Sequence, residues 1–296
     1  MQKPTVTNDM KEFTVMTDIN TDIDASYAEA EHIVILPQYY HFNDGVIYGD
    51  EQKLEPPVFY KRLLEGERAY SMGCNPERVR ELFEAELDAG RDILCIMFSS
   101  ELSGSYSTVS VVAQELMGER DCRICVIDSL NGSVAAGLMV YLAQEMKKQG
   151  HTLEEVRDAI EARKKDFDIL FLVDHLDCLV RGGRLNAVSG AVGTVLNIKP
   201  ILHFEEGKIV SFLKCRGKNN AKRTMLDTMK KLNLDKTLVA VAHSDNLEEA
   251  KEFAAEVEAE LGVKVVYINE INLTIGTHTG PDAIGVAFCK LPDKEN

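Results

Sequence analysis

Short apolar runs alternate with longer amphipathic segments through the first half of the chain. Short apolar runs bounded by turn residues are typical of strands, whereas apolar residues recurring every three to four positions are typical of helices. We expect strands at 13–18, 33–37, 93–98 and 124–127, with helices from 76 to about 90, from 106 to 117, and up to Gly150. This alternation of strand and helix predicts a parallel sheet with helices on both faces.

Local signals define several helix ends. Asn75 is a good N-cap, and Pro76 is favoured at the first helical position. Thr152 and Glu155 have the spacing of a capping box. We place a domain boundary near this second helix, with an N-terminal α/β domain over residues 1–160 and a C-terminal one over 161–296.

The second half of the chain has a more mixed pattern. Two apolar runs, 201–204 and 209–213, joined through Glu206-Gly207, predict a hairpin. Further strands are expected at 169–173, 238–242 and 263–268, and helices at 187–196, from 220, and from 246 to 262. The sequence therefore predicts a two-domain α/β protein, with parallel or mixed sheets flanked by helices and a ligand cleft between the domains.

Charge and composition exclude some classes of function. The 296 residues include 48 acidic and 33 basic side chains, a net charge of −15, which argues against a nucleic-acid-binding protein. Met1 to Lys11 is polar and lacks the apolar core of a signal peptide. No apolar run reaches the roughly 18 residues of a spanning helix. We expect a cytoplasmic protein without stable membrane insertion.

The cysteines and histidines do not indicate a metal site or a cofactor. The seven cysteines lie mostly in apolar runs and are expected to be reduced. Cys122 and Cys125 have metal or redox spacing, but no second pair accompanies them. No His-Glu-x-x-His motif occurs.

The loop after the strand at 93–98 is rich in hydroxyl groups. It carries Ser99, Ser100, Ser103, Gly104 and Ser105. One serine suffices to cap the helix that follows, so four favour contact with a ligand. Because a helix N-terminus presents free amides and a positive dipole end, this loop is suited to a carboxylate or a phosphate.

Three other loops hold small polar residues and glycines. Asp128-Ser129 with Ser133 fits a helix cap and a ligand site equally well. Arg184 follows paired glycines, and a nearby basic segment contains Arg216; guanidinium groups pair with carboxylate or phosphate. His278 lies in a loop of hydroxyl residues and glycines, where a ligand contact and a structural hydrogen bond are equally expected.

Taken together, these segments resemble the DegV family along nearly the whole chain. The resemblance rests on the order and spacing of several motifs: Thr17-Asp18, Thr21-Asp22, Asn43-Asp44-Gly45 with Tyr48, Ser99-Ser100-x-Leu-Ser-Gly, Asp128-Ser129, Gly-Gly-Arg184, Ile198-Lys199-Pro200, Lys214-x-Arg216 and His278-Thr-Gly-Pro. It implies an EDD-type fold of two α/β domains that bind one long-chain fatty acid between them. It also implies a partner, a separate fatty acid kinase that phosphorylates the carboxylate to an acyl phosphate for phospholipid synthesis.

The resemblance also suggests which residues hold the carboxylate. The second serine of the Ser-Ser-x-Leu-Ser-Gly motif corresponds to Ser100. The family's other carboxylate contact is a hydroxyl residue: counting back from Ser100 without gaps places it at Tyr70, whereas side-chain chemistry favours Ser71. We favour Ser71, with His278 close by. Ser99, Ser103, Gly104, Arg184 and Arg216 are further candidates for ligand or partner contact. Asp282 replaces a family glycine and adds negative charge near this anion site.

Two other classes of function compete with a carrier. A serine-dependent acyl hydrolase or transferase would use Ser100 or Ser103 with His278 and Asp128, but the chain has no Gly-x-Ser-x-Gly elbow. A kinase activity of its own is not indicated, because the phosphate-binding Gly-x-x-x-x-Gly-Lys-Ser/Thr loop is absent. An interaction protein with an unrelated ligand is the third class.

Overall fold

The computed structural model describes residues 11–174, 176–185 and 198–292. The first sheet has four parallel strands in the order β2-β1-β6-β7. Their bounds are β1 (Phe13–Asp18), β2 (Val34–Leu36), β6 (Asp92–Met97) and β7 (Ile124–Asp128). Every residue of β1 and β6 is buried, as expected for central strands covered on both faces. The predicted parallel sheet is confirmed.

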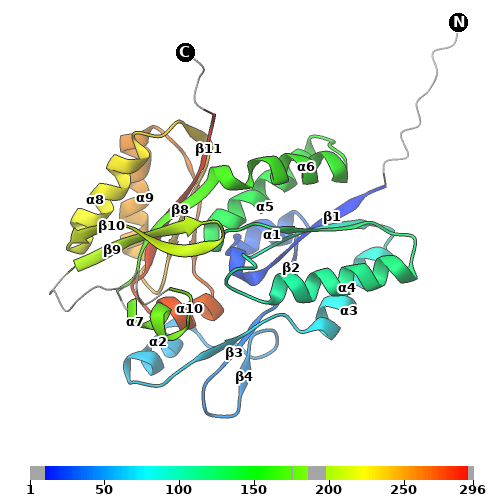
Figure 1. Ribbon diagram of the computed structural model, residues 1–296, viewed down its shortest axis with the longest axis horizontal. Helices are drawn as coiled ribbons and strands as arrows, with labels where there is room; N and C mark the ends of the chain where they lie inside the picture. Colours follow the sequence, from blue (N-terminus) through cyan, green and yellow to red (C-terminus); the bar gives the residue numbers. More distant parts are fainter. Residues whose placement is uncertain (1–10, 175, 186–197, 293–296) are drawn as a thin grey trace, which may run out of the picture.

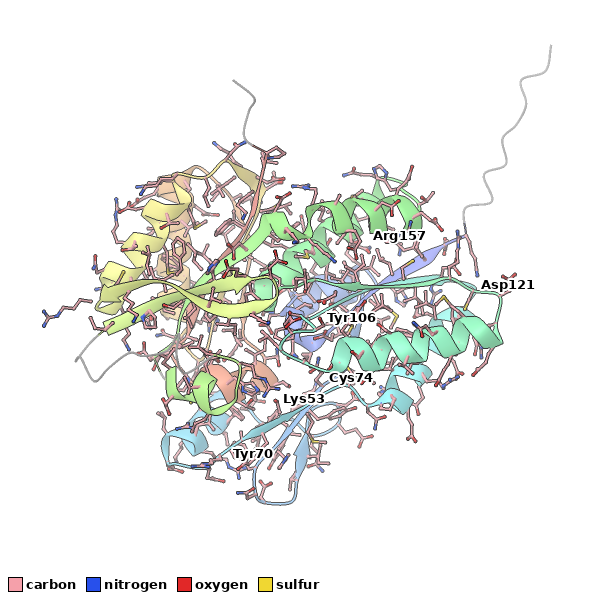
Figure 2. All side chains as sticks on the ribbon, in the orientation of Figure 1. Lys53, Tyr70, Cys74, Tyr106, Asp121 and Arg157 are labelled. Carbon is pink, nitrogen blue, oxygen red and sulfur yellow. The ribbon has the colours of Figure 1, made fainter. Side chains whose placement is uncertain are left out.

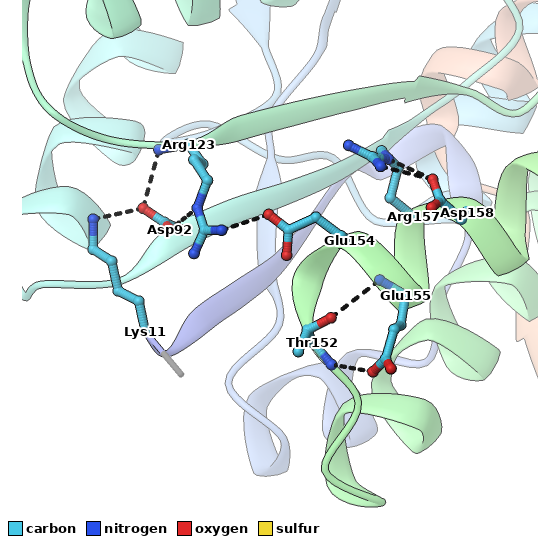
Figure 3. A network of polar contacts seen from close by, with 8 residues as sticks. All are labelled: Lys11, Asp92, Arg123, Thr152, Glu154, Glu155, Arg157 and Asp158. Atoms are coloured by element: carbon cyan, nitrogen blue, oxygen red, sulfur yellow. Dashed lines mark hydrogen bonds and ion pairs between the residues drawn. The ribbon is translucent and has the colours of Figure 1, made fainter. Parts of the chain in front are cut away.

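Helices and a short 3₁₀ turn accompany this sheet (Figure 1): η1 (Ile19–Thr21), α1 (Ala25–Ala30), α3 (Pro76–Asp88), α4 (Ser105–Glu119), α5 (Ser133–Lys148) and α6 (Leu153–Arg163). The predicted caps are present: Asn75 Oδ1 accepts from the first amides of α3, and Thr152 and Glu155 form the capping box of α6. Figure 3 shows this box beside Asp92, a buried carboxylate paired with Lys11 and Arg123.

The second sheet has six strands in the order β10-β9-β8-β13-β11-β12. Its strands are β8 (Phe167–Leu172), β9 (Ile198–Glu205), β10 (Lys208–Arg216), β11 (Leu234–His243), β12 (Val265–Glu270) and β13 (Ile284–Lys290). The β9–β10 hairpin is confirmed, and β11 and β12 run parallel, so the sheet is mixed. On one side, α8 (Lys218–Met229) and α9 (Leu247–Leu261) pack against it (Figure 1).

Helix α5 lies between the two sheets (Figure 1). It contacts β1 and β6 of the first sheet and β8, β11 and β13 of the second. One hydrophobic cluster therefore joins both halves around it. The predicted boundary at 160/161 falls inside α6, which is followed by η2 (Lys164–Asp166), and the domain limits stay a prediction.

A third, small sheet had no counterpart in the predicted elements. It has the order β4-β3-β5, with β3 (Tyr39–His41), β4 (Ile47–Tyr48) and β5 (Tyr70–Met72), and α2 (Pro56–Leu64) packs beside it. Its core is aromatic: Tyr40, Phe42, Phe59 and Tyr60 are buried together. Strands of two or three residues are too short for hydrophobic alternation to reveal.

Two segments expected to be loops contain helices. The segment around His278 forms α10 (Leu273–Thr279), and α7 (Leu176–Arg181) precedes the paired glycines. The Asn272 side chain caps α10. The segment was expected to be a loop because of its glycines and proline, so this helix start was missed. The helix expected at 187–196 lies outside the described residues. No helix within the described ranges is long and apolar enough to cross a membrane.

Candidate functional site

A cavity of about 400 Å³ has walls from all three sheets. Phe98 follows a strand of the first sheet, Phe171 lies in the second, and Ser71 lies in the third. The remaining walls come from the N-termini of α4 and α5, from Arg184 after α7, and from α10. This volume falls within the roughly 300–1,000 Å³ that is usual for small-ligand sites.

The polarity of this cavity changes from its opening to its inner end. Met72, Gly73 and Gly104 line it and are exposed, so they mark the opening. The wall formed by the second sheet is buried and apolar: Ile169, Phe171, Ala242 and Ile284. The half-buried polar side chains of the lining are Ser71, Ser103, Thr108, Arg184 and His278, and a few further polar residues line it deeper in the molecule. An elongated ligand with one polar end matches this division.

Ser71 and His278 meet in the cavity wall. The Ser71 Oγ and the His278 Nε2 are 2.8 Å apart, a hydrogen bond between β5 and α10. Ser71 pairs with Tyr40 across the small sheet, which fixes the face that its hydroxyl occupies. Cys74, two residues beyond β5, also lines the cavity, and Figure 2 shows it between the small sheet and α4.

The environment of His278 keeps its imidazole neutral. Burial, with a smaller contribution from the Arg184 charge, lowers the pKa of His278 to about 4. Its Nδ1 is buried, with no hydrogen-bond partner among the described residues. A buried unpaired N–H costs more than an unpaired lone pair, so the proton belongs on Nε2. Nε2–H then donates to the Ser71 oxygen, and the Ser71 hydroxyl proton is free to point at a ligand.

Ser103 and Ser105 form a second polar group, where α4 begins. Their hydroxyls are 3.0 Å apart, and the Ser105 amide donates to the Ser103 Oγ at 3.2 Å. The Ser105 Oγ also accepts from the Cys74 amide at 3.1 Å, which joins α4 to the end of β5. Gly104, the N-cap of this 15-residue helix, lines the cavity together with Ser105, so the positive end of the helix dipole lies at the cavity wall.

Arg184 brings a positive charge to the same wall. Its Nε donates to the Leu102 carbonyl at 3.2 Å and its Nη1 to the Gly182 carbonyl at 2.5 Å. Within the part of the chain that the structure describes, no carboxylate pairs with this guanidinium. A charge held by carbonyls and left without a counter-ion favours an anionic ligand.

Three of the residues expected at the ligand lie outside the cavity lining. The Ser99 hydroxyl donates to the Gly207 carbonyl at 2.7 Å, and the Ser100 amide donates to Asp128 at 3.2 Å. The Ser99 hydroxyl therefore faces the β9–β10 hairpin, and the Ser100 backbone is held to the end of β7. Arg216 is exposed at the end of β10. In this loop the structure brings Ser103 and Gly104, rather than Ser100, to the cavity.

The structure also distinguishes Tyr70 from Ser71. Tyr70 is exposed on the outer face of the small sheet, where it stacks on His41, whereas Ser71 faces the cavity. Asp282 lies outside the lining, and its carboxylate accepts from Asn246 Nδ2 at 3.3 Å. Its negative charge is thus directed toward the cap of α9.

Some lining residues had no signal in the sequence. Asn20 and Gln38 line the cavity and are buried; Thr274, also buried in the lining, begins the hydroxyl-rich segment that contains His278. Asn20 lies in η1, which Asp18 caps; the Asp18 carboxylate also accepts from the Phe98 amide at 2.7 Å. Burial raises the pKa of Asp18 to about 7. The early Asp-rich motif therefore shapes the cavity wall through its backbone contacts.

Metal chemistry finds no support in the geometry. Across residues 11–174, 176–185 and 198–292, no group of three or more His, Cys, Asp or Glu could hold a metal ion. Cys122 and Cys125 are both free thiols.

Comparison with known proteins agrees on one family. The family model described as "Uncharacterised protein, DegV family" matches residues 12–291. A DegV domain-containing protein of Clostridium perfringens is 32% identical over 284 residues, covering 94% of this chain and 98% of the relative. A protein of Thermotoga maritima named fatty acid-binding protein is 29% identical over 287 residues, with 95% and 98% covered.

Solved structures of similar fold include fatty-acid-binding proteins. A stearic acid-binding protein from Eubacterium ventriosum superposes with a TM-score of 0.85 and 25% identity, covering 94% of this chain and 98% of its own. DegV of Bacillus subtilis, described as a fatty acid binding protein, gives a TM-score of 0.81 and 28% identity, with 95% and 100% covered.

Proposed function

The chain belongs to the DegV family, and from that premise we propose that it binds one long-chain fatty acid in the cavity. The observation that carries this proposal is that one cavity combines a buried apolar wall on the second sheet with half-buried polar side chains near its exposed lining residues. The tail would lie against Ile169, Ala242 and Ile284, and the carboxylate would lie at the opening. Similar proteins that bind fatty acids, from Eubacterium ventriosum and Bacillus subtilis, support the same ligand class.

Burial of the tail would provide most of the affinity. Each methylene removed from water contributes about 0.8 kcal/mol, so a long chain gains far more than one head group can. The head must still exchange its hydration for protein donors, because an unpaired carboxylate loses much of that gain. Specificity for an acid would come from the donors at the opening.

Four groups are suited to hold the carboxylate. The Ser71 hydroxyl would donate directly, and the Ser103 hydroxyl would donate on turning from Ser105 to the ligand. Arg184 would provide charge, and His278 would hold the Ser71 oxygen through Nε2. Hydrogen bonds to an ionised acceptor are about twice as strong as neutral ones. Ser100, which was also expected in this role, lies in the same loop but outside the lining, and its contact with the ligand stays a prediction.

We further propose that the protein is a carrier that presents the carboxylate to a separate fatty acid kinase. The exposed lining residues Met72, Gly73 and Gly104 support this, because a head group beside them lies within reach of a second protein. Arg216, exposed at the end of β10, is available to a partner rather than to the ligand. Such a carrier would work in the cytoplasm, where a kinase has ATP.

The experiment that tests binding is native mass spectrometry of the freshly purified protein. A retained mass equal to one long-chain fatty acid is the expected result, and delipidated protein should rebind the acid more tightly than its methyl ester. A protein that neither retains nor rebinds fatty acid would refute the proposal. For presentation, the loaded protein should be the better substrate for a fatty acid kinase than free fatty acid, with acyl phosphate as the readout.

The alternative of a serine hydrolase or acyltransferase finds little support in the geometry. Ser100 lies outside the cavity, and it is Ser71 that contacts His278. In a catalytic triad a third group orients the imidazole through Nδ1, whereas here Nδ1 is unpartnered among the described residues. A fluorophosphonate probe should leave the protein unlabelled.

A further inference from the structure

A single buried carboxylate joins the first half of the chain to helix α10. Asp22 Oδ1 accepts from the Asn272 amide at 2.9 Å and from the Asn272 Nδ2 at 2.8 Å. The other oxygen of Asp22 accepts from the Ser133 hydroxyl, at the first residue of α5, at 2.6 Å. Asp22 itself is only 4% exposed. Its carboxylate therefore connects η1, α5 and α10 at one point.

Asn272 has two roles in this joint. Its Oδ1 caps α10 by accepting from the Thr274 and Ile275 amides, at 2.9 and 3.3 Å. Its Nδ2 faces the first half of the chain and donates to Asp22 and to the Ile19 carbonyl, the latter at 3.1 Å. The cap and the side-chain part of the joint thus use opposite ends of one amide, so a substitution can remove either alone, while the Asn272 backbone amide keeps its own bond to Asp22.

The backbone around the joint is held in an uncommon conformation. Asp22 has φ of 45° and Ser133 has φ of 49°, left-handed values that non-glycine residues adopt rarely. Asn269 Nδ2 donates to the carbonyls of Asp22 and Ile23, at 2.9 and 3.2 Å, so β12 reinforces the same turn. A conformation of this kind persists when surrounding contacts over-determine it.

The joint lies in the wall of the ligand cavity. Asn20 and Ser133 line the cavity on the first-half side, and Ile271, Thr274 and His278 line it on the α10 side. Helix α10 is only seven residues long, and its far end carries the His278 that contacts Ser71. So short a helix is not stable by itself, so its position depends on tertiary contacts: its packing on α7, β5 and β3, and the bonds that fix its first turn.

We propose that Asp22 and Asn272 form a clasp that positions α10 and thereby holds His278 against Ser71 at the cavity opening. Both are positioning residues, since they act on the ligand through His278 and not by contact. The functional part of this inference rests on the proposed fatty acid binding; the structural part does not, because the His278 contact exists without ligand.

The test compares three variants with wild type. Asn272→Asp keeps an oxygen to cap α10 but replaces the Nδ2 donor with an acceptor facing Asp22. Asp22→Ala breaks the clasp from the other side and leaves the cap of α10 intact. Asp22→Asn retains an oxygen for Asn272 and an amide for the Ser133 hydroxyl, so it conserves the clasp. Asn75→Asp, at the exposed N-cap of α3, is the matched control for the Asn-to-Asp change.

The first readout is the titration of the His278 ring by NMR in ligand-free protein. In wild type and in Asp22→Asn the ring should titrate at low pH, because it is buried. In Asn272→Asp and Asp22→Ala a loosened α10 admits water, and the pKa should rise toward its ordinary value of about 6.5. A residue that contributes only to global stability would lower the melting temperature without moving this titration.

The second readout is the rate at which bound cis-parinaric acid, a fluorescent fatty acid, dissociates. Release should be roughly tenfold faster in Asn272→Asp and Asp22→Ala and unchanged in Asp22→Asn and Asn75→Asp. Wild-type His278 titration in both folded clasp variants would overturn the inference. A shift of the His278 pKa in Asp22→Asn equal to that in the clasp variants would also overturn it, because the effect would then belong to the charge of Asp22. Should the other two variants fail to fold, the titration in Asp22→Asn is the deciding measurement. Failure of wild type to bind cis-parinaric acid would refute the proposed function and leave the titration result standing.

Discussion

Ser71 and His278 lie 2.8 Å apart although 207 residues separate them in the sequence. Ser71 belongs to the small antiparallel sheet inserted in the first half, and His278 belongs to α10 of the second. Neither half contains both parts of this polar contact. The cavity and its polar opening therefore exist only when the two halves pack together.

Replacing Ser71 with alanine should weaken binding of a fatty acid and spare that of its methyl ester. The variant loses a donor to a charged carboxylate, which is worth about 1.5–3 kcal/mol, or about tenfold or more in Kd. Displacement of a fluorescent fatty acid measures both ligands. Ser107→Ala, exposed on α4 and outside the lining, is the control. Equal losses for acid and ester would contradict a contact with the head group.

Ser103 and Ser100 can be compared within one loop. Because Ser103 lines the cavity and Ser100 does not, Ser103→Ala should reduce retention of the fatty acid more than Ser100→Ala. We expect about 1 kcal/mol or more for Ser103, and within about 0.5 kcal/mol for Ser100. Mass spectrometry of the co-purified ligand in both variants provides the measurement. A larger loss of retained fatty acid in Ser100→Ala than in Ser103→Ala would instead support Ser100 as the carboxylate contact.

Much of the fold could be predicted from local sequence patterns, because most of its strands are long enough to show a hydrophobic pattern and its helix caps have characteristic residues. The capping box at Thr152, the cap at Asn246 and the β9–β10 hairpin each have a local cause in neighbouring residues. The small sheet escaped prediction since its three strands have only two or three residues each. Its stability comes from aromatic packing on α2, which periodicity does not report.

The candidate site was only partly predictable for a related reason. Family likeness pointed to Arg184 and His278, side-chain chemistry favoured Ser71 over Tyr70, and the structure brings all three to one cavity. It also pointed to Ser100, but which serine of a crowded loop faces inward depends on the turn. That turn is set by distant partners, Gly207 for Ser99 and Asp128 for Ser100. Tertiary contacts of this kind cannot be predicted from the serine-rich sequence of the loop alone.

Gly182→Ala should displace His278. A Cβ at residue 182 would lie 2.2 Å from the His278 Nδ1, so the imidazole must shift away from its present position. Overpacking of this kind costs about 1–3 kcal/mol, and chemical denaturation should show it together with a loss of fatty acid affinity. Gly118→Ala, on α4 with nothing within 4 Å of the added carbon, should do neither. Wild-type affinity in the Gly182 variant would mean that His278 has no part in holding the ligand.

Ala242→Leu should change the preferred chain length. Ala242 is fully buried at the end of β11 and lines the inner end of the cavity, so a larger side chain would occupy space meant for the tail. Affinity for stearate should fall by about 0.8 kcal/mol for each methylene displaced, whereas affinity for decanoate should hold. Titration of the variant with both acids makes each its own control. A parallel loss for both would place the tail elsewhere.

The buried imidazole of His278 makes the stability of the protein depend on pH. Burial lowers its pKa from 6.5 to about 4, so between these values the unfolded chain binds a proton that the folded protein does not. The contribution of this group to the free energy of unfolding is therefore fully present at neutral pH and is lost as the pH falls from about 6.5 toward 4.

His278→Gln, which cannot titrate, should remove this pH dependence. The free energy of unfolding of the variant should therefore rise by about 2 kcal/mol relative to that of wild type between pH 7 and pH 5. Urea denaturation of both proteins at the two pH values measures the difference, and buried Asp18 and Asp22 cancel in the comparison because both proteins keep them. A variant whose stability runs parallel to wild type over this range would show that His278 is hydrated and charged at pH 5, which is incompatible with its place in the cavity wall.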